Sequence, residues 1–191
     1  MDYIPLIGDI ILSDGTHFGA KCVKFFMQSP TIWHQIYYFL TKKLVNVPYY
    51  HVAMIINSGY NVNNQSILIE QQKRVQINNW NPNKKQIIFR KKHTTFDTVL
   101  KLQEIALNDL DKKYDVLNIF GKLFTWLTGI KWFARYIESP NKEICVNRVC
   151  KWYLDALNEK FGAKKHSEIT TQSLYYYLLN NPNYEVVYKK D

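Results

Sequence analysis

Strand-forming and helix-forming segments are segregated along this chain rather than alternating. Short runs rich in β-branched and aromatic residues, separated by turn signals, predict strands at residues 8–13, 51–56, 67–71, 74–77, 86–91 and 184–188. Helical spacing of apolar residues predicts helices at residues 18–27, 32–44, 95–108, 114–136, 143–161 and 170–180, the helix at 143–161 ending with Gly162 as its C′ residue. Segregation of this kind is typical of an α+β fold with a small antiparallel sheet packed against helices.

The chain is expected to form a single domain, 1–191. Its 191 residues contain no internal repeat, low-complexity tract or Gly/Ser/Pro-rich linker. This length is sufficient to bury a full hydrophobic core.

Charge and cysteine content narrow the function classes. The net charge of +9 favours anionic partners such as phospholipid headgroups or cell-wall polymers. The basic residues occur in short scattered runs of two or three, and no nucleic-acid-binding motif accompanies them, so nucleic acid is the weakest partner class. Three cysteines without CxxC spacing, and histidines not spaced as ligand pairs, predict neither a disulfide framework nor a metal site; no cofactor is expected. The sequence shows no signal-peptide pattern and no apolar run of transmembrane length, so a cytoplasmic or virion-associated location is expected.

Cys145 is the candidate nucleophile. Residues 139–143 read as a helix-start segment, which places Cys145 in or near the first helical turn. The N–H groups and dipole of that turn would lower the thiol pKa and stabilise an oxyanion. The alternative is a small buried core residue, as free cysteines usually are. Cys150, further along the helix, is interpreted as core.

His51 and Glu70 are the candidate general base and its orienting carboxylate. His51 begins the strand at 51–56 and Glu70 ends the apolar run 67–69. The imidazole would exchange a proton with the thiol, and the carboxylate would fix its tautomer. A structural, hydrogen-bonded histidine and an exposed strand-end glutamate are the alternatives. Tyr114 is a candidate substrate-binding residue, against the commoner case of a packed tyrosine.

Together these pieces resemble the circularly permuted NlpC-type branch of papain-like cysteine hydrolases, which includes YiiX-like and lecithin:retinol acyltransferase-like proteins. Six segments carry the resemblance in order: the Gly-Asp strand at 8–12, the His strand at 50–55, the carboxylate-ending strand at 68–70, the Tyr-Asp pair at 114–115, the Cys helix start at 145–149 and the Thr-x-x-x-Leu segment at 170–174. The resemblance covers nearly the whole chain.

This resemblance implies a permuted papain-like fold with Cys145 as nucleophile, His51 as general base and Glu70 as orienting residue. The chain departs from the pattern at Val146 and Asn147, where the family has Ser-Glu, and at Ala53, where it has Gly. It also carries a long aromatic helical insertion at about residues 14–50. The departure beside Cys145 is expected to disturb the packing behind the nucleophile.

The function expected from the resemblance is a thiol hydrolase or acyltransferase acting on an amide or ester. Peptidoglycan peptides and acyl lipids are the family's substrate precedents. The apolar, aromatic segment 116–137 is interpreted either as a membrane-interface helix or as a core or lid helix beside the cleft. The competing hypothesis is a catalytically silent papain-like module within a larger assembly, for instance a virion.

Overall fold

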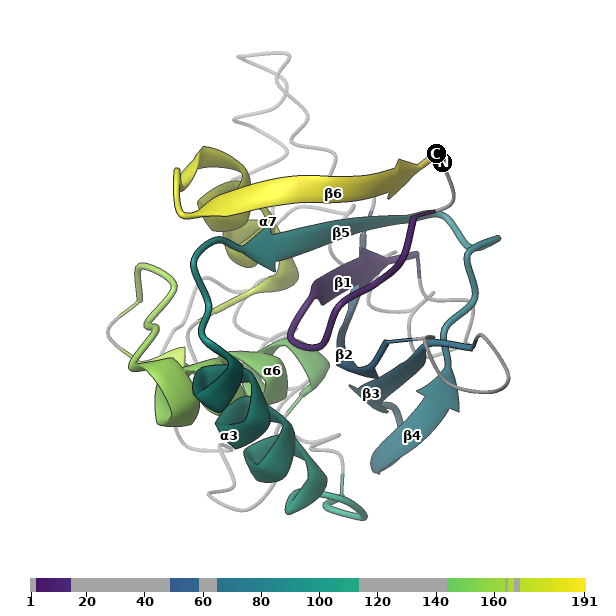
Figure 1. Ribbon diagram of the computed structural model, residues 1–191, viewed down its shortest axis with the longest axis vertical. Helices are drawn as coiled ribbons and strands as arrows, with labels where there is room; N and C mark the ends of the chain where they lie inside the picture. Colours follow the sequence, from purple (N-terminus) through teal and green to yellow (C-terminus); the bar gives the residue numbers. More distant parts are fainter. Residues whose placement is uncertain (1–2, 15–48, 59–64, 114–143, 164, 167–168) are drawn as a thin grey trace, which may run out of the picture.

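The computed structural model describes residues 3–14, 49–58, 65–113, 144–163, 165–166 and 169–191. In these residues the six strands are β1 (Ile10–Ser13), β2 (His51–Asn57), β3 (Ile67–Gln71), β4 (Val75–Asn79), β5 (Gln86–Lys91) and β6 (Tyr184–Lys190). They form one sheet in the order β4-β3-β2-β1-β5-β6, and each neighbouring pair is antiparallel (Figure 1). The predicted strands are all present, with ends that differ by at most two residues.

The helices in the described residues are α3 (Phe96–Leu107), α6 (Cys145–Leu157) and α7 (Thr171–Asn180). Thr95 caps α3 by accepting a hydrogen bond from the backbone of Thr98. Thr170 caps α7 in a capping box with Ser173. The α+β class is therefore confirmed for the described part of the chain.

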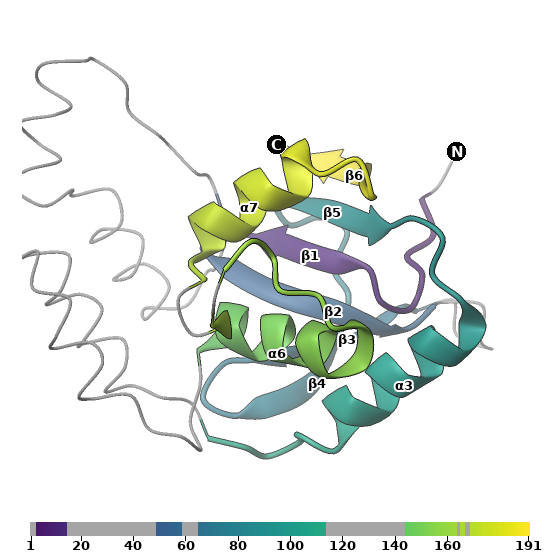
Figure 2. The same ribbon diagram turned by 90° about the vertical axis from the view of Figure 1, so that its left-hand side faces the viewer.

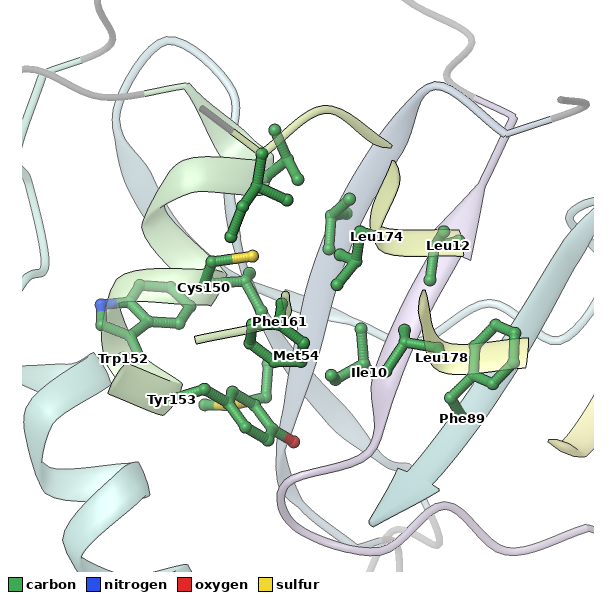
Figure 3. Packing of buried hydrophobic residues seen from close by; sticks show 14 of the residues in the cluster. Ile10, Leu12, Met54, Phe89, Cys150, Trp152, Tyr153, Phe161, Leu174 and Leu178 are labelled. Atoms are coloured by element: carbon green, nitrogen blue, oxygen red, sulfur yellow. The ribbon is translucent and has the colours of Figure 1, made fainter. Parts of the chain in front are cut away.

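All three helices pack on one face of the sheet (Figure 2). The core between them joins Ile10 and Met54 of the central strands to Trp152 of α6 and Leu178 of α7 (Figure 3). The opposite face carries a smaller apolar cluster that includes Ala53 and is packed against aromatic side chains. Because successive strand residues point to opposite faces, β1 and β2 are buried on both sides, which explains their continuous apolar runs.

The end of α6 is where the sequence-based prediction of an element is wrong. The helix stops at Leu157, and its C-cap is Asn158 in the left-handed conformation, with φ 54°. Asparagine tolerates this conformation better than most non-glycine residues, so Asn158 ends the helix four residues before Gly162. Gly162 also has a positive φ, of 74°, but it lies in a following turn rather than at the C′ position.

Several predictions fall outside the described residues. These are the helices expected at 18–27, 32–44 and 114–136, Tyr114, and the aromatic insertion at 14–50 apart from its ends. Whether the whole chain forms one domain stays a prediction.

Candidate functional site

The pairing of β2 with β3 places His51 and Glu70 on the same face of the sheet. Glu70 lies directly opposite Ala53, and Ala53 is two residues after His51 in the same strand. Residues two apart in a strand share a face, so His51 and Glu70 are diagonal neighbours within side-chain reach. The His51 Nε2 atom lies 2.5 Å from the Glu70 Oε2 atom.

Glu70 is held in place by a complete set of donors. Its side chain is 8% exposed, and its Oε2 atom takes the hydrogen bond of His51. Its Oε1 atom accepts a hydrogen bond of 2.6 Å from the Gln72 side-chain amide and another of 2.6 Å from that of Asn78. The carboxylate is therefore buried with both oxygens satisfied, which a buried charge requires.

Cys145 is the first residue of α6, following the N-cap residue Ile144. Its thiol is hydrogen-bonded to the His51 ring and to the backbone of Val52 and Val146. The first residue pair between β2 and β3 is Ala53 with Glu70, and Val52 comes just before it. The sulfur, which contacts the Val52 backbone, therefore lies at the end of the sheet where β2 begins. Because Nε2 of His51 faces Glu70, its other ring nitrogen, Nδ1, is the one left to contact Cys145.

The pKa values of the three groups favour charge on each. Burial by itself would raise the pKa of Cys145, but the hydrogen bond and charge of His51 lower it below the ordinary thiol value. Burial would lower the pKa of His51, but hydrogen bonds and charges from Cys145 and Glu70 raise it to about 10. Burial would raise the pKa of Glu70, but the contacts with His51, Asn78 and Gln72 lower it to about 2. The imidazolium thus stabilises the thiolate on one side and the carboxylate on the other.

The expected disturbance behind Cys145 is not seen. Val146 is 2% exposed and packs in the core shared with the sheet. Asn147 is 1% exposed, and its side-chain amide donates to the backbone oxygens of His166 (2.6 Å) and Ile169 (3.0 Å). Asn147 stands where the family pattern has a glutamate, and its amide connects α6 to the segment that leads into α7.

The structure also bears on the remaining residues that the sequence singled out, and it adds two that the sequence did not. Cys150 is 1% exposed in the core, which confirms its interpretation as a core residue. Tyr114 lies outside the described residues. Asn78 and Gln72 were missed by sequence reasoning. The signal that could have found Asn78 is a polar side chain on the strand next to Glu70, but such a signal has meaning only once the β3–β4 register is known.

No group of three or more His, Cys, Asp or Glu side chains in the described residues is arranged to hold a metal ion. None of the helices there combines the length and apolar character that a membrane-crossing segment needs.

Comparison with known proteins gave a structural match. No protein-family model matches the sequence, and no curated protein is similar to it at a significant level. Among solved structures, the chain is similar to the crystal structure of the metalloprotein YiiX from Escherichia coli O157:H7, with a TM-score of 0.60 and 18% sequence identity. The match covers 97% of this chain and 98% of the YiiX chain. The likeness shows that this chain has a YiiX-like α+β fold.

Proposed function

We propose that this protein is a papain-like thiol hydrolase or acyltransferase that attacks an amide or ester carbonyl with Cys145. The observation that carries the proposal is the position of the His51 ring, which contacts the Glu70 carboxylate on one side and the Cys145 thiol on the other. Cysteine nucleophiles commonly lie at a helix N-terminus, next to a base that a third group holds in position.

The resemblance to permuted NlpC-type enzymes supports the same proposal. In that branch the nucleophile follows the histidine and the carboxylate in the chain, which is the order of His51, Glu70 and Cys145 here. The structural match supports the YiiX-like fold alone. The step from that fold to the permuted NlpC-type branch rests on the sequence resemblance, which includes YiiX-like proteins. A single permuted papain-like domain spanning residues 1–191 is part of the proposal.

The chemistry follows from the ionisation of the three groups. The Cys145 thiolate attacks the carbonyl carbon, and the carbonyl oxygen takes the negative charge of the tetrahedral intermediate. N–H groups of the first turn of α6 stabilise that oxygen. The carbon–nitrogen or carbon–oxygen bond then breaks, His51 gives its proton to the leaving amine or alcohol, and a thioester with Cys145 remains. Glu70 keeps the imidazole oriented and stabilises its positive charge.

The acceptor that attacks the thioester decides between the two activities. Neutral His51 removes a proton from the acceptor, the acyl group moves to it, and Cys145 leaves as a thiolate. Water gives hydrolysis, whereas an amine or alcohol gives acyl transfer. Peptidoglycan peptides and acyl lipids are the proposed substrate classes, and the net charge of +9 suits either an anionic cell-wall polymer or a phospholipid surface.

Incubation with defined substrates tests this proposal. Wild type and Cys145→Ala are each incubated with purified peptidoglycan and with phospholipid vesicles, and products are identified by mass spectrometry. Wild type is expected to release product from one substrate and to show a mass increase on Cys145 from the acyl-enzyme. Cys150→Ala is the matched control because Cys150 is buried in the same helix and outside the site. Equal product from wild type and Cys145→Ala would refute the assignment.

A second candidate is a silent papain-like module, for instance a virion component. The observation that favours it is the burial of Cys145, which is 6% exposed. In that case a small electrophilic thiol reagent would label Cys145 as slowly as Cys150. Faster labelling of Cys145 near neutral pH supports the enzyme.

A further inference from the structure

The two oxygens of Glu70 have different partners. Oε2 contacts His51, whereas Oε1 accepts hydrogen bonds from the side-chain amides of Asn78 and Gln72. The amide donors lie on the opposite side of the carboxyl group from the imidazole. They therefore fix the direction in which the carboxylate faces the ring.

The backbone places Asn78 for this contact. Asn78 lies opposite Leu68 in the β3–β4 ladder, and Leu68 is two residues before Glu70. Asn78 and Glu70 are thus diagonal neighbours on one face of the sheet, as His51 and Glu70 are across the β2–β3 ladder. Gln72 follows the end of β3, in the turn that leads into β4.

We propose that Asn78, assisted by Gln72, is a positioning residue that keeps Glu70 ionised and turned toward His51, so that Cys145 stays a thiolate in mildly acidic conditions. This role rests on the proposed function for its catalytic meaning. Asn78 touches neither the thiol nor the imidazole in the contacts described, and it acts through Glu70.

An amide N–H group can only donate to the carboxyl oxygen, whatever the pH. A protonated Glu70 would accept these bonds less strongly, so the two amides favour the carboxylate over the acid. The charged group that faces Glu70 is His51 of β2, which in turn contacts Cys145 of α6. Strand β4 contributes no charged side chain on this side, since its sequence is Val-Gln-Ile-Asn-Asn.

The pH profile of Cys145 alkylation tests this role in the full-length protein. The rate of reaction with iodoacetamide is measured from about pH 3.5 to pH 9 for wild type, Asn78→Asp, Asn78→Ala and Gln72→Ala. Asn78→Asp replaces a donor by a second carboxylate of the same shape and has the largest expected effect. The acid-limb midpoint is the pH at which the alkylation rate falls to half as Cys145 is protonated. We expect this midpoint to rise by about one pH unit in Asn78→Asp, which makes alkylation about tenfold slower at pH values below it. Asn78→Ala is expected to shift the midpoint less, and Gln72→Ala less again.

Asn79→Asp is the matched control because it adds the same charge to the next residue of β4, whose side chain is exposed and points to the other face. Its midpoint should stay within about 0.3 pH unit of wild type. Equal midpoints for Asn78→Asp and Asn79→Asp would overturn the proposal. A rate lowered by one constant factor at every pH would also overturn it, since that is the result of general structural damage.

A direct titration of Glu70 separates this inference from the proposed function. The carboxyl carbon of Glu70 is followed by NMR in wild type, Asn78→Ala and Asn78→Asp, after circular dichroism has shown that each is folded. A Glu70 midpoint that rises in both variants supports the positioning role even if Cys145 proves unreactive, a result that would refute the thiol chemistry alone. An unchanged Glu70 midpoint would overturn the role of Asn78 even if Cys145 is reactive.

Discussion

The two ends of the paired strands β1 and β2 hold buried carboxyl groups in contrasting settings. At one end, Asp9 accepts two hydrogen bonds of 2.8 Å from the Arg90 guanidinium, one of 2.6 Å from the Tyr3 hydroxyl and one from the Leu6 backbone. At the other end, Glu70 contacts His51, whose ring contacts a thiol. The Arg90 guanidinium beside Asp9 cannot give up its proton, whereas the imidazole beside Glu70 can pass a proton to a reacting group.

This difference separates a structural ion pair from a site suited to chemistry. The Asp9 cluster joins the N-terminal segment to β5, and burial beside the Asp9 carboxylate raises the pKa of Tyr3, which keeps its hydroxyl protonated. The Glu70 cluster ends in Cys145, a group that is both acidic and nucleophilic. Burial of a carboxylate is common to both sites, so burial alone does not identify function.

The largest expected effect is the loss of turnover in Cys145→Ala. Removal of the nucleophile should lower turnover by at least about 1,000-fold, because the thiol that forms the thioester beside His51 is lost. The free energy of unfolding should change by only about 1 kcal/mol, since a small side chain is removed. Product formation with the substrate found by mass spectrometry and urea unfolding give the two values. If Cys145→Ala kept its turnover, the Glu70 cluster would be no more catalytic than the Asp9 cluster.

Asp9→Asn should have the opposite pattern. Loss of the carboxylate leaves the Arg90 charge without its partner and should lower the free energy of unfolding by about 3 kcal/mol. The acid-limb midpoint of Cys145 alkylation should not move, because the Asp9 cluster lies at the far end of β2. Urea unfolding and alkylation kinetics of the same preparation measure both. If Asp9→Asn shifted the midpoint of Cys145 alkylation and left the free energy of unfolding unchanged, Asp9 would belong to the reactive site and not to a structural ion pair.

Glu70 should also make stability depend on pH. Its pKa in the folded protein, about 2, lies below the value of 4.5 expected when the chain is unfolded. The stabilisation is therefore complete above pH 4.5 and is lost as the pH falls toward 2. By pH 3 wild type should lose about 2 kcal/mol that Glu70→Gln does not lose. Parallel loss in both proteins, measured by urea unfolding at several pH values, would contradict the low pKa.

The smallest expected effect is on turnover in Glu70→Gln. Glutamine can still hydrogen-bond the imidazole but does not supply a negative charge, so we expect turnover to fall by about tenfold near neutral pH. Comparison of pH–rate profiles with wild type measures it. An unchanged rate would remove Glu70 from the site.

Local patterns predicted much of the sheet. The ranges of β3 and β5 match the expected strands residue for residue, since both are short apolar runs between turn signals. The position of Cys145 in the first turn of α6 also follows from the sequence, although the helix starts two residues after the predicted residue 143. The end of α6 did not, because the prediction looked for a glycine at the helix end, whereas an asparagine, Asn158, takes the left-handed conformation there.

The contacts that hold the Asp9 and Glu70 carboxylates could not be predicted from local sequence patterns. Arg90 is 81 residues from Asp9, and Asn78 meets Glu70 only because β4 takes one register on β3. A shift of that register by one residue would turn Asn78 to the other face. Sequence reasoning proposed Cys145, His51 and Glu70 as a set, because together they supply a nucleophile, a base and an orienting carboxylate in the order that the resemblance implies. Their supporting amides are ordinary polar residues, and only the sheet brings them together.

The central claim is that Cys145 is ionised by His51, and the pH dependence of its alkylation tests this most directly. The rate of iodoacetamide labelling at Cys145 is compared with that at Cys150 in wild type and in His51→Ala, with peptide mass spectrometry to assign the site. The account predicts that wild-type Cys145 reacts well below the pH at which an ordinary thiol ionises, and that His51→Ala moves its midpoint up toward about pH 8.5. A wild-type midpoint already at that value, unchanged in His51→Ala, would contradict the account.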